Sequence, residues 1–352
     1  MGLLLKYFRK NLFQVIFHVT FRCNAKCGFC FNWRDINTGV KPELSIEEIE
    51  KISKSMPSFP WLMLSGGEPV LRADLADIII IFYKNNKIRH VTLPTNGIAS
   101  GALLKVCSEV LAKCRKLSLT VSFSLDGLGA DHDEMRNVKG CYDFVMKSFS
   151  EIKPLRKDKR LNVKFHTVVT SGNYTKLGGI IDLVKSMKPD MHTIEFVRGD
   201  LKDKNICLPP QGEIPAIIKQ IKDNYEYYGG YSNLKSHLSP LNKLSKIIQR
   251  EYLDLCQEIF CKKEQVMPCL AHKLSLVIYP YGDVSFCEPL KQFGNIKDYG
   301  CDYRLLIKSE PAKKQAGLIK RKQCYCYHPC FQYLNIVFSR KRMAGAVLKN
   351  VF

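Results

Sequence analysis

Three cysteines, Cys23, Cys27 and Cys30, are separated by three and then two residues and follow an apolar run at 15–19. This run predicts a buried strand, so the cysteines should lie in the loop at its carboxyl end. Three thiolates in one loop can hold three irons of a four-iron cluster and leave the fourth iron open, as catalysis requires. The alternative is a zinc site, but zinc sites usually add a second Cys or His pair, and none lies nearby.

Five further strand patterns follow, and helical patterns separate them. We expect strands at residues 61–64, 90–93, 119–123, 163–169 and 193–197. The first helix should begin at Ser45, which forms a capping-box pattern with Glu48. Regular alternation of strands and helices implies right-handed crossovers and a parallel sheet. The predicted fold class is therefore α/β, with a partial (β/α)6 parallel barrel.

The unusual polar clusters all fall where a predicted strand ends. They are Ser-Gly-Gly-Glu-Pro at 65–69, Thr-Asn-Gly at 95–97 and Ser-Leu-Asp-Gly at 124–127. In parallel barrels the chemistry gathers in the loops at the carboxyl ends of the strands. These clusters and the cysteine loop should therefore share one edge of the sheet.

The chain beyond residue 198 has a different pattern, with two expected helices at 213–228 and 240–260. A β-hairpin is expected at 274–279 and 284–286, with Cys269 before it and Cys287 at its end. Cys324, Cys326 and Cys330 follow before a basic tail. We therefore divide the chain into the barrel (1–198), a helical connection (199–262) and a C-terminal α+β cluster-binding extension built on the hairpin (263–352).

Composition restricts the class of protein. The 352 residues include 15 cysteines, and 46% are hydrophobic, enough for a full core. Residues 1–10 show no secretory signal and no run is long enough to cross a membrane, so we expect a reducing, cytoplasmic location. The net charge of +21 favours an anionic partner, which includes peripheral contact with anionic lipid, or it is simply a solvated basic surface. The scattered lysines indicate no dedicated nucleic-acid module.

With these loops assembled, the chain resembles the radical S-adenosylmethionine (SAM) superfamily. The cysteine spacing matches its signature, and residues 65–69 match its second motif. Ser124 to Gly127, followed by His132, Asp133 and Arg136, resembles the anaerobic sulfatase-maturing and peptide-modifying subgroup. Cys269, Gly282 and Cys287 resemble the opening of the SPASM/twitch auxiliary-cluster domain.

The resemblance implies a [4Fe–4S] cluster at Cys23, Cys27 and Cys30, whose open iron chelates SAM. The glycines allow close backbone approach, and Glu68 would pair with the SAM ammonium. Arg136 would pair with its carboxylate. Further contacts to SAM are implied for Gly66, Gly67, Phe29, Asn96, Ser124 and Asp126, with structural roles as alternatives for Phe29, Asn96, Asp126 and Arg136, and Val168 and Thr170 would flank the adenine.

The five tail cysteines are too few for two complete clusters. The resemblance implies one auxiliary [4Fe–4S] cluster, and we expect Cys269, Cys287 and Cys330 as ligands. The fourth ligand would be Cys324 or Cys326, with His328 as a further candidate, and zinc is the alternative metal. Most of the other seven cysteines should be small buried side chains.

The implied reaction begins with hydrogen abstraction from a substrate carbon, and an auxiliary cluster favours oxidation or crosslinking. The substrate is either a peptide or a small anionic metabolite such as a sugar, a nucleotide or a lipid head group. The catalytic base is unknown; His18, Asp126, Glu195 and Arg198 lie near strand ends and could supply a base or an anion clamp. The implied electron donor is a flavodoxin or ferredoxin, and the non-enzymatic alternative is an iron–sulfur or zinc scaffold.

Overall fold

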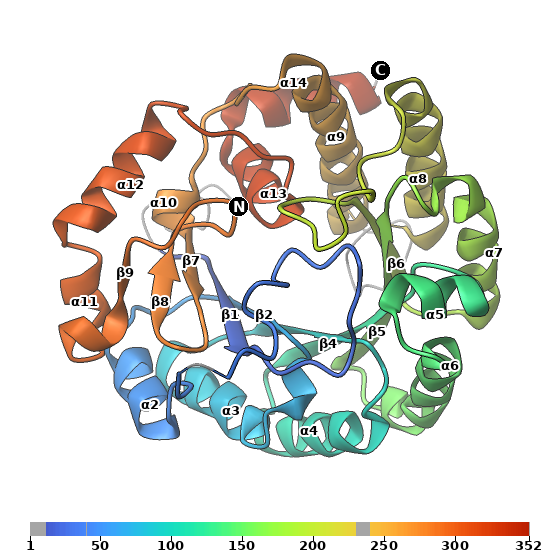
Figure 1. Ribbon diagram of the computed structural model, residues 1–352. Coiled ribbons are helices and arrows are strands. Elements are labelled where there is room, and N and C mark those ends of the chain that lie inside the picture. Colours follow the sequence, from blue (N-terminus) through green and yellow to red (C-terminus); the bar gives the residue numbers. More distant parts are fainter. Residues whose placement is uncertain (1–11, 40, 230–239, 352) are drawn as a thin grey trace.

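Nine strands form one continuous sheet in the computed structural model, which describes residues 12–39, 41–229 and 240–351. The strand order is β6-β5-β4-β3-β2-β1-β7-β8-β9. Neighbouring strands from β1 to β6 are all parallel, and the sheet curves around an interior with helices on its outer side (Figure 1). The predicted α/β partial barrel is therefore confirmed.

The barrel strands begin and end close to the predicted positions. They are β1 (Gln14–Thr20), β2 (Trp61–Gly66), β3 (His90–Thr95), β4 (Ser118–Ser124), β5 (Leu161–Val169) and β6 (Met191–Phe196). The helices of this part are α2 (Ile46–Ser55), α3 (Leu75–Asn86), α4 (Ser100–Lys113), α5 (Ala130–Arg136), α6 (Cys141–Glu151), α7 (Leu177–Met187) and α8 (Ile214–Tyr228). The capping box between Ser45 and Glu48 forms as predicted.

The strands divide their side chains between two faces. On β5, Val163 and Phe165 belong to the apolar core that packs against the outer helices. Since side chains alternate along a strand, Lys164 and His166 lie on the opposite, inner face. The same alternation on β1 puts Val15, Phe17 and Val19 in that core and His18 on the inner face. The barrel interior therefore carries ionisable groups.

The C-terminal hairpin extends the barrel sheet directly. Strand β7 (Ser275–Ile278) pairs in parallel with β1 and antiparallel with β8 (Asp283–Ser285), which pairs with β9 (Gly294–Asn295). The helices of this part are α9 (Pro240–Lys262), α10 (Ala271–Leu274), α11 (Tyr303–Leu306), α12 (Glu310–Lys320), α13 (Pro329–Phe338) and α14 (Arg340–Val351). Helices α9 and α13 lie between the β6 and β7 sides of the sheet (Figure 1).

Short 3-10 helices complete the connections. They are η1 (Pro69–Leu71), η2 (Lys153–Lys157), η3 (Tyr174–Lys176), η4 (Gln211–Glu213) and η5 (Ile296–Tyr299). No described helix is both long and apolar enough to cross a bilayer. The prediction made for residues 1–10 lies outside the described residues. Of the seven cysteines expected to be packing residues, Cys207 and Cys261 are exposed, and the rest are buried: Cys107, Cys114, Cys141, Cys256 and Cys301.

Candidate radical-generating and auxiliary sites

The three-cysteine loop follows β1, and Cys23, Cys27 and Cys30 are each partly exposed. The side chain of Asn37 holds the start of the loop, because it accepts from the backbone N–H of Cys23 at 2.9 Å and donates to its carbonyl at 2.8 Å. The N–H of Lys26 donates to the carbonyl of Arg136 at 3.1 Å. The loop is thus fixed at both its beginning and its middle.

The Gly-Gly-Glu segment after β2 lies directly against the cysteine loop. The N–H of Gly67 donates to the carbonyl of Thr20 at 2.8 Å, and the N–H of Glu68 donates to that of Arg22 at 2.9 Å. A Cβ atom on Gly67 would lie 2.2 Å from the Arg22 oxygen, and Gly66 has a φ of +114°. Only glycine permits this approach, so these two loops form one surface.

Glu68 presents a buried carboxylate at this surface. Its Oε2 accepts a hydrogen bond from the backbone N–H of Asn96 at 2.7 Å. Its Oε1 is buried and has no hydrogen-bond partner in the described part of the chain. Burial raises the pKa of Glu68 to about 7. A buried carboxylate oxygen without a donor is suited to a ligand that brings a cation.

Asp126 and Arg136 form a buried ion pair beside the cysteines. The Nε of Arg136 donates to Asp126 Oδ2 at 2.8 Å, and its Nη2 makes a second bond to the same oxygen. Its Nη1 lies 3.7 Å from the sulfur of Cys27, and the guanidinium lies 5.2 Å from the ring centre of Phe29. Arg136 is the last residue of the short helix α5. Its buried side chain connects Asp126 in the loop after β4 to the cysteine loop after β1.

The remaining predicted contacts lie near this surface. The side chain of Asn96 donates to Asn24 Oδ1, inside the cysteine loop, at 2.7 Å. Ser124 is the last residue of β4 and pairs in register with His166. Thr170 is buried, and its N–H donates to Asn173 at 2.8 Å. The N–H of Val168 on β5 donates to Asp126 Oδ1 at 2.8 Å, and the side chain of Asn173 donates to the carbonyl of Asp126 at 2.9 Å, so the loop after β4 is joined to β5 and to the loop that follows it.

The three thiols after β1 are a donor set that a four-iron cluster can use. In the described residues no three Cys, His, Asp or Glu side chains are grouped to hold one metal ion. A four-iron cluster instead distributes its thiolates over different irons. Burial raises the pKa of Cys23 to about 12 and that of Cys30 to about 11, so binding of iron would release protons from these thiols.

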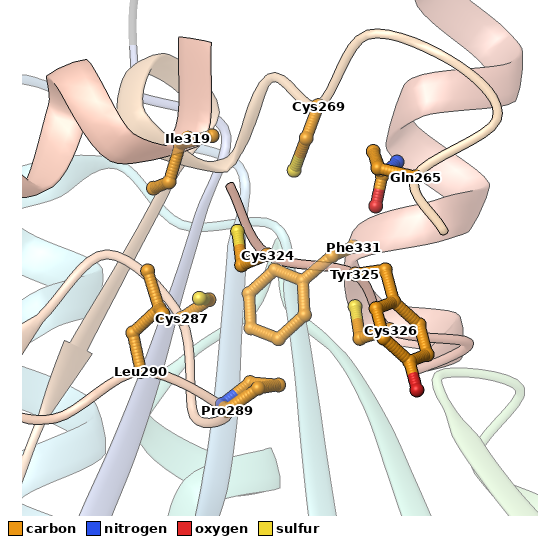
Figure 2. Close-up of a pocket in the computed structure, with 10 residues that line it drawn as sticks. All are labelled: Gln265, Cys269, Cys287, Pro289, Leu290, Ile319, Cys324, Tyr325, Cys326 and Phe331. Atoms are coloured by element: carbon orange, nitrogen blue, oxygen red, sulfur yellow. The ribbon is translucent and has the colours of Figure 1, made fainter. Parts of the chain in front are cut away.

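A second cysteine group lines a pocket in the C-terminal extension. Cys269 precedes α10, Cys287 follows β8, and Cys324 and Cys326 lie between α12 and α13. Figure 2 shows these four side chains around the pocket with the ring of Phe331 among them. The side chain of Gln332 donates to the carbonyl and to the sulfur of Cys326. These two hydrogen bonds hold Cys326, a candidate metal ligand, in position.

Cys330 and His328 are not among the residues that line this pocket. His328 is buried and makes a short contact with Glu288, the residue after Cys287. The other oxygen of Glu288 lies 2.9 Å from Nε2 of His18 on β1. Burial alone would raise the pKa of Glu288, but His328 and His18 outweigh it and lower this pKa well below its usual value. The contacts of Glu288 thus connect the extension to the barrel interior.

The inner wall continues along β5 and β6. His166 Nε2 lies 3.4 Å from Glu195 Oε1, and Arg198 Nη1 donates to Glu195 Oε2 at 3.1 Å. Arg198 Nη2 also lies 3.9 Å from Glu288. Of these residues, the sequence indicated His18, Glu195 and Arg198 as candidates. It missed Glu288, although its position directly after Cys287 was a signal.

Comparison with known proteins identifies the family of the barrel segment. A model described as the radical SAM superfamily matches residues 17–184. This segment belongs to the radical SAM superfamily. The matched residues contain the cysteine loop, the Gly-Gly-Glu segment, and both Asp126 and Arg136. The radical SAM fold implies bound SAM and a [4Fe–4S] cluster, in agreement with the donor set after β1.

Curated relatives of this radical SAM segment differ in activity. Fe-coproporphyrin III synthase from Methanosarcina barkeri is 28% identical over 53% of this chain and 44% of its own length. GTP 3′,8-cyclase from Clostridium perfringens is 28% identical over 58% of this chain and 61% of its own length. The chain thus spans about half the length of the curated relatives it matches.

A solved structure shares the fold of nearly the whole chain. The structure of anSMEcpe with bound AdoMet and the Cp18Cys peptide matches with a TM-score of 0.60 and 15% identity. The match covers 97% of this chain and 99% of that one. The likeness therefore extends from the radical SAM barrel through the C-terminal extension.

Proposed function

We propose that this chain cleaves SAM reductively and uses the resulting 5′-deoxyadenosyl radical to remove a hydrogen atom from a substrate carbon. The observation that carries the proposal is the contact between the cysteine loop and the loop of Gly67 and Glu68. A [4Fe–4S] cluster at Cys23, Cys27 and Cys30 would supply the electron for this cleavage and an open iron for SAM. A flavodoxin or ferredoxin in a reducing cytoplasm would be the electron source.

The residues around the cysteine loop would bind and orient SAM. Oε1 of Glu68 would accept a hydrogen bond from the SAM ammonium, since it has no donor among the described residues. A guanidinium has five N–H donors. Among the described residues, Asp126 and Cys27 take three of the donors on Arg136, which leaves two for the SAM carboxylate.

The other proposed contacts would hold the nucleoside. Ser124 would donate to polar groups of SAM from the end of β4. Asn96 would keep the third strand-end loop against the cysteine loop and contact the ribose. Phe29 is 8% exposed and packs in an apolar cluster with Val197 and Leu201, which would form one side of the adenine site.

We propose one auxiliary [4Fe–4S] cluster in the extension, held by Cys269, Cys287, Cys324 and Cys326. All four line the same pocket, which supports this set of ligands over one that includes Cys330. Such a cluster would accept an electron from a substrate radical, which favours oxidation or crosslinking. Zinc at the same four thiolates is the alternative. The division at residues 198 and 262 remains a prediction.

The substrate we favour is a peptide or protein. The likeness to anSMEcpe, whose structure holds a peptide, covers both the barrel and the extension and supports this choice. A small anionic metabolite is the second candidate, because GTP 3′,8-cyclase is among the relatives. In either case the inner wall of His166, Glu195 and Arg198 would face the substrate.

Anaerobic reconstitution with iron and sulfide, followed by SAM and dithionite, tests the proposed function. We expect 5′-deoxyadenosine and methionine, and mass spectrometry of candidate peptides and metabolites should identify the modified substrate. A reconstituted protein that holds its clusters but forms no 5′-deoxyadenosine would instead be an iron–sulfur scaffold. Glu50→Gln on the outer helix α2 is a control variant that should behave like the wild type.

A further inference from the structure

A tyrosine lies exposed at the auxiliary pocket. Tyr325 stands between Cys324 and Cys326, and all three line the pocket. The side chain of Tyr325 is 48% exposed. Pro289, which also lines the pocket, is exposed as well. The pocket therefore reaches the protein surface at an apolar spot.

Cations surround this spot. Lys320, Arg321 and Lys322 are exposed and lie in the sequence between Ile319 and Cys324, which both line the pocket. Lys291 is exposed and follows Leu290, another lining residue. We call these four cations, together with Tyr325 and Pro289, the Tyr325 rim. In the described part of the chain none of the four makes a salt bridge.

Contacts within the extension hold the rim together. Gln315 on α12 donates to the carbonyl of Lys291 at 2.6 Å and accepts from the N–H of Phe286 at 2.9 Å. One exposed carboxylate, Glu264, lies beside the lining residue Gln265. The rim is therefore a fixed and mainly basic surface.

We infer that the Tyr325 rim is the docking surface for an acidic protein electron carrier that exchanges single electrons with the auxiliary site. The inference rests on the proposed function, since it requires a redox cluster in the pocket. The charge pattern suits such a partner, because an apolar centre with a complementary charged border combines contact area with electrostatic steering.

In the proposed reaction such a carrier takes up the electron that the substrate radical releases. Removal of a hydrogen atom leaves a substrate radical, and conversion to a carbonyl or a new bond releases one more electron and one proton. The electron passes through the auxiliary site to the oxidised carrier, which is reduced by one electron, and the proton goes to solvent. The carrier can then return an electron for the next SAM cleavage.

The test isolates the auxiliary cluster in the full chain. The Cys23→Ala, Cys27→Ala, Cys30→Ala variant is reconstituted, and its reduction by an acidic flavodoxin hydroquinone is followed by stopped-flow absorbance under anaerobic conditions. Adding Lys320→Glu, Arg321→Glu and Lys322→Glu should lower the second-order rate constant about tenfold or more at low salt. Reduction by dithionite should be unchanged.

A matched control carries three charge reversals elsewhere, at Lys113, Arg115 and Lys116, which are exposed around the end of α4. Its rate should stay within about twofold of the parent. If the charge reversals at 320–322 and the control charge reversals give equal rate constants, the inference is overturned while the proposed function stays intact. Absence of iron from the parent variant would overturn both the auxiliary cluster and the inference, but not SAM cleavage by the wild type.

Discussion

Nε2 of His18 lies 2.9 Å from the carboxylate of Glu288, and this contact joins β1 to the residue that follows Cys287. Both side chains are almost fully buried, with exposures of 0% and 8%. The sequence positions are 270 residues apart, yet the register of β1 with β7 brings them together. The barrel interior and the auxiliary pocket are thus connected through one carboxylate.

Replacement of Glu288 should therefore destabilise the whole fold. Glu288→Ala removes the anion that His18, His328 and Arg198 share, and loss of one partner from a buried ion pair costs about 3–5 kcal/mol. Glu50→Ala is the matched control, because Glu50 makes only an exposed pair with Lys54 and should change stability by less than about 1 kcal/mol. Urea unfolding of both variants measures the difference. Equal midpoints would show that the Glu288 pairs contribute nothing.

The buried carboxylate of Glu68 should lower the stability of the SAM-free protein and strengthen the binding of SAM. Its folded-state pKa of about 7 lies above the ordinary value of 4.5, so its contribution to stability is present below pH 4.5 and is lost as the pH rises through 7. Glu68→Gln should therefore stabilise the SAM-free protein at pH 8 by up to roughly 3 kcal/mol and have little effect at pH 4.5.

The same variant should bind SAM more weakly, because the neutral amide is a poorer partner for an ammonium. Urea unfolding at the two pH values and equilibrium dialysis with SAM measure the two effects. A gain in stability of the same size at both pH values would contradict the assignment of the pKa shift to Glu68. Unchanged SAM affinity would remove Glu68 from the binding site.

The barrel could be predicted because each element carries its own local pattern. The apolar run at 15–19 and the capping box of Ser45 and Glu48 need no distant partner to be recognised. Helix α5 was not predicted because it has only seven residues. Helix α12 was not predicted because it buries only Ala312, Gln315 and Ile319. Short or mostly exposed helices leave a weak periodic signal.

The candidate site was only partly predictable for a different reason. The strand-end residues follow from the parallel sheet, which gathers their loops at one edge. The partners of Glu288 depend on long-range strand pairing, which no local pattern reports. Helix α13 begins at Pro329, and successive helical side chains point about 100° apart. Phe331 lines the pocket and Cys330 does not, so the proposed ligand set differs from the predicted one at Cys330.

Single substitutions should distinguish the auxiliary ligands. In the Cys23→Ala, Cys27→Ala, Cys30→Ala background, Cys330→Ser should retain about four irons per chain, whereas Cys326→Ser should lose most of them. The reason is that Cys326 lines the pocket and Cys330 does not. Iron and zinc are counted after anaerobic reconstitution. Loss of iron in Cys330→Ser would support the ligand set expected from the sequence. Zinc in place of iron would show a structural zinc site instead of a cluster.

Gly67 should be required for the position of the cysteine loop rather than for the formation of the barrel. A Cβ atom there would lie 2.2 Å from the carbonyl oxygen of Arg22 and 3.1 Å from Cβ of Cys23, so Gly67→Ala must push this loop away. Overpacking of this kind costs about 1–3 kcal/mol. Gly101→Ala is the control, since a Cβ at that position meets nothing within 4 Å and alanine favours helix α4. Gly67→Ala should hold less iron at the first site, bind SAM more weakly and unfold at lower urea than Gly101→Ala. If the two variants hold equal iron and unfold together, the close approach of the two loops does not shape the site.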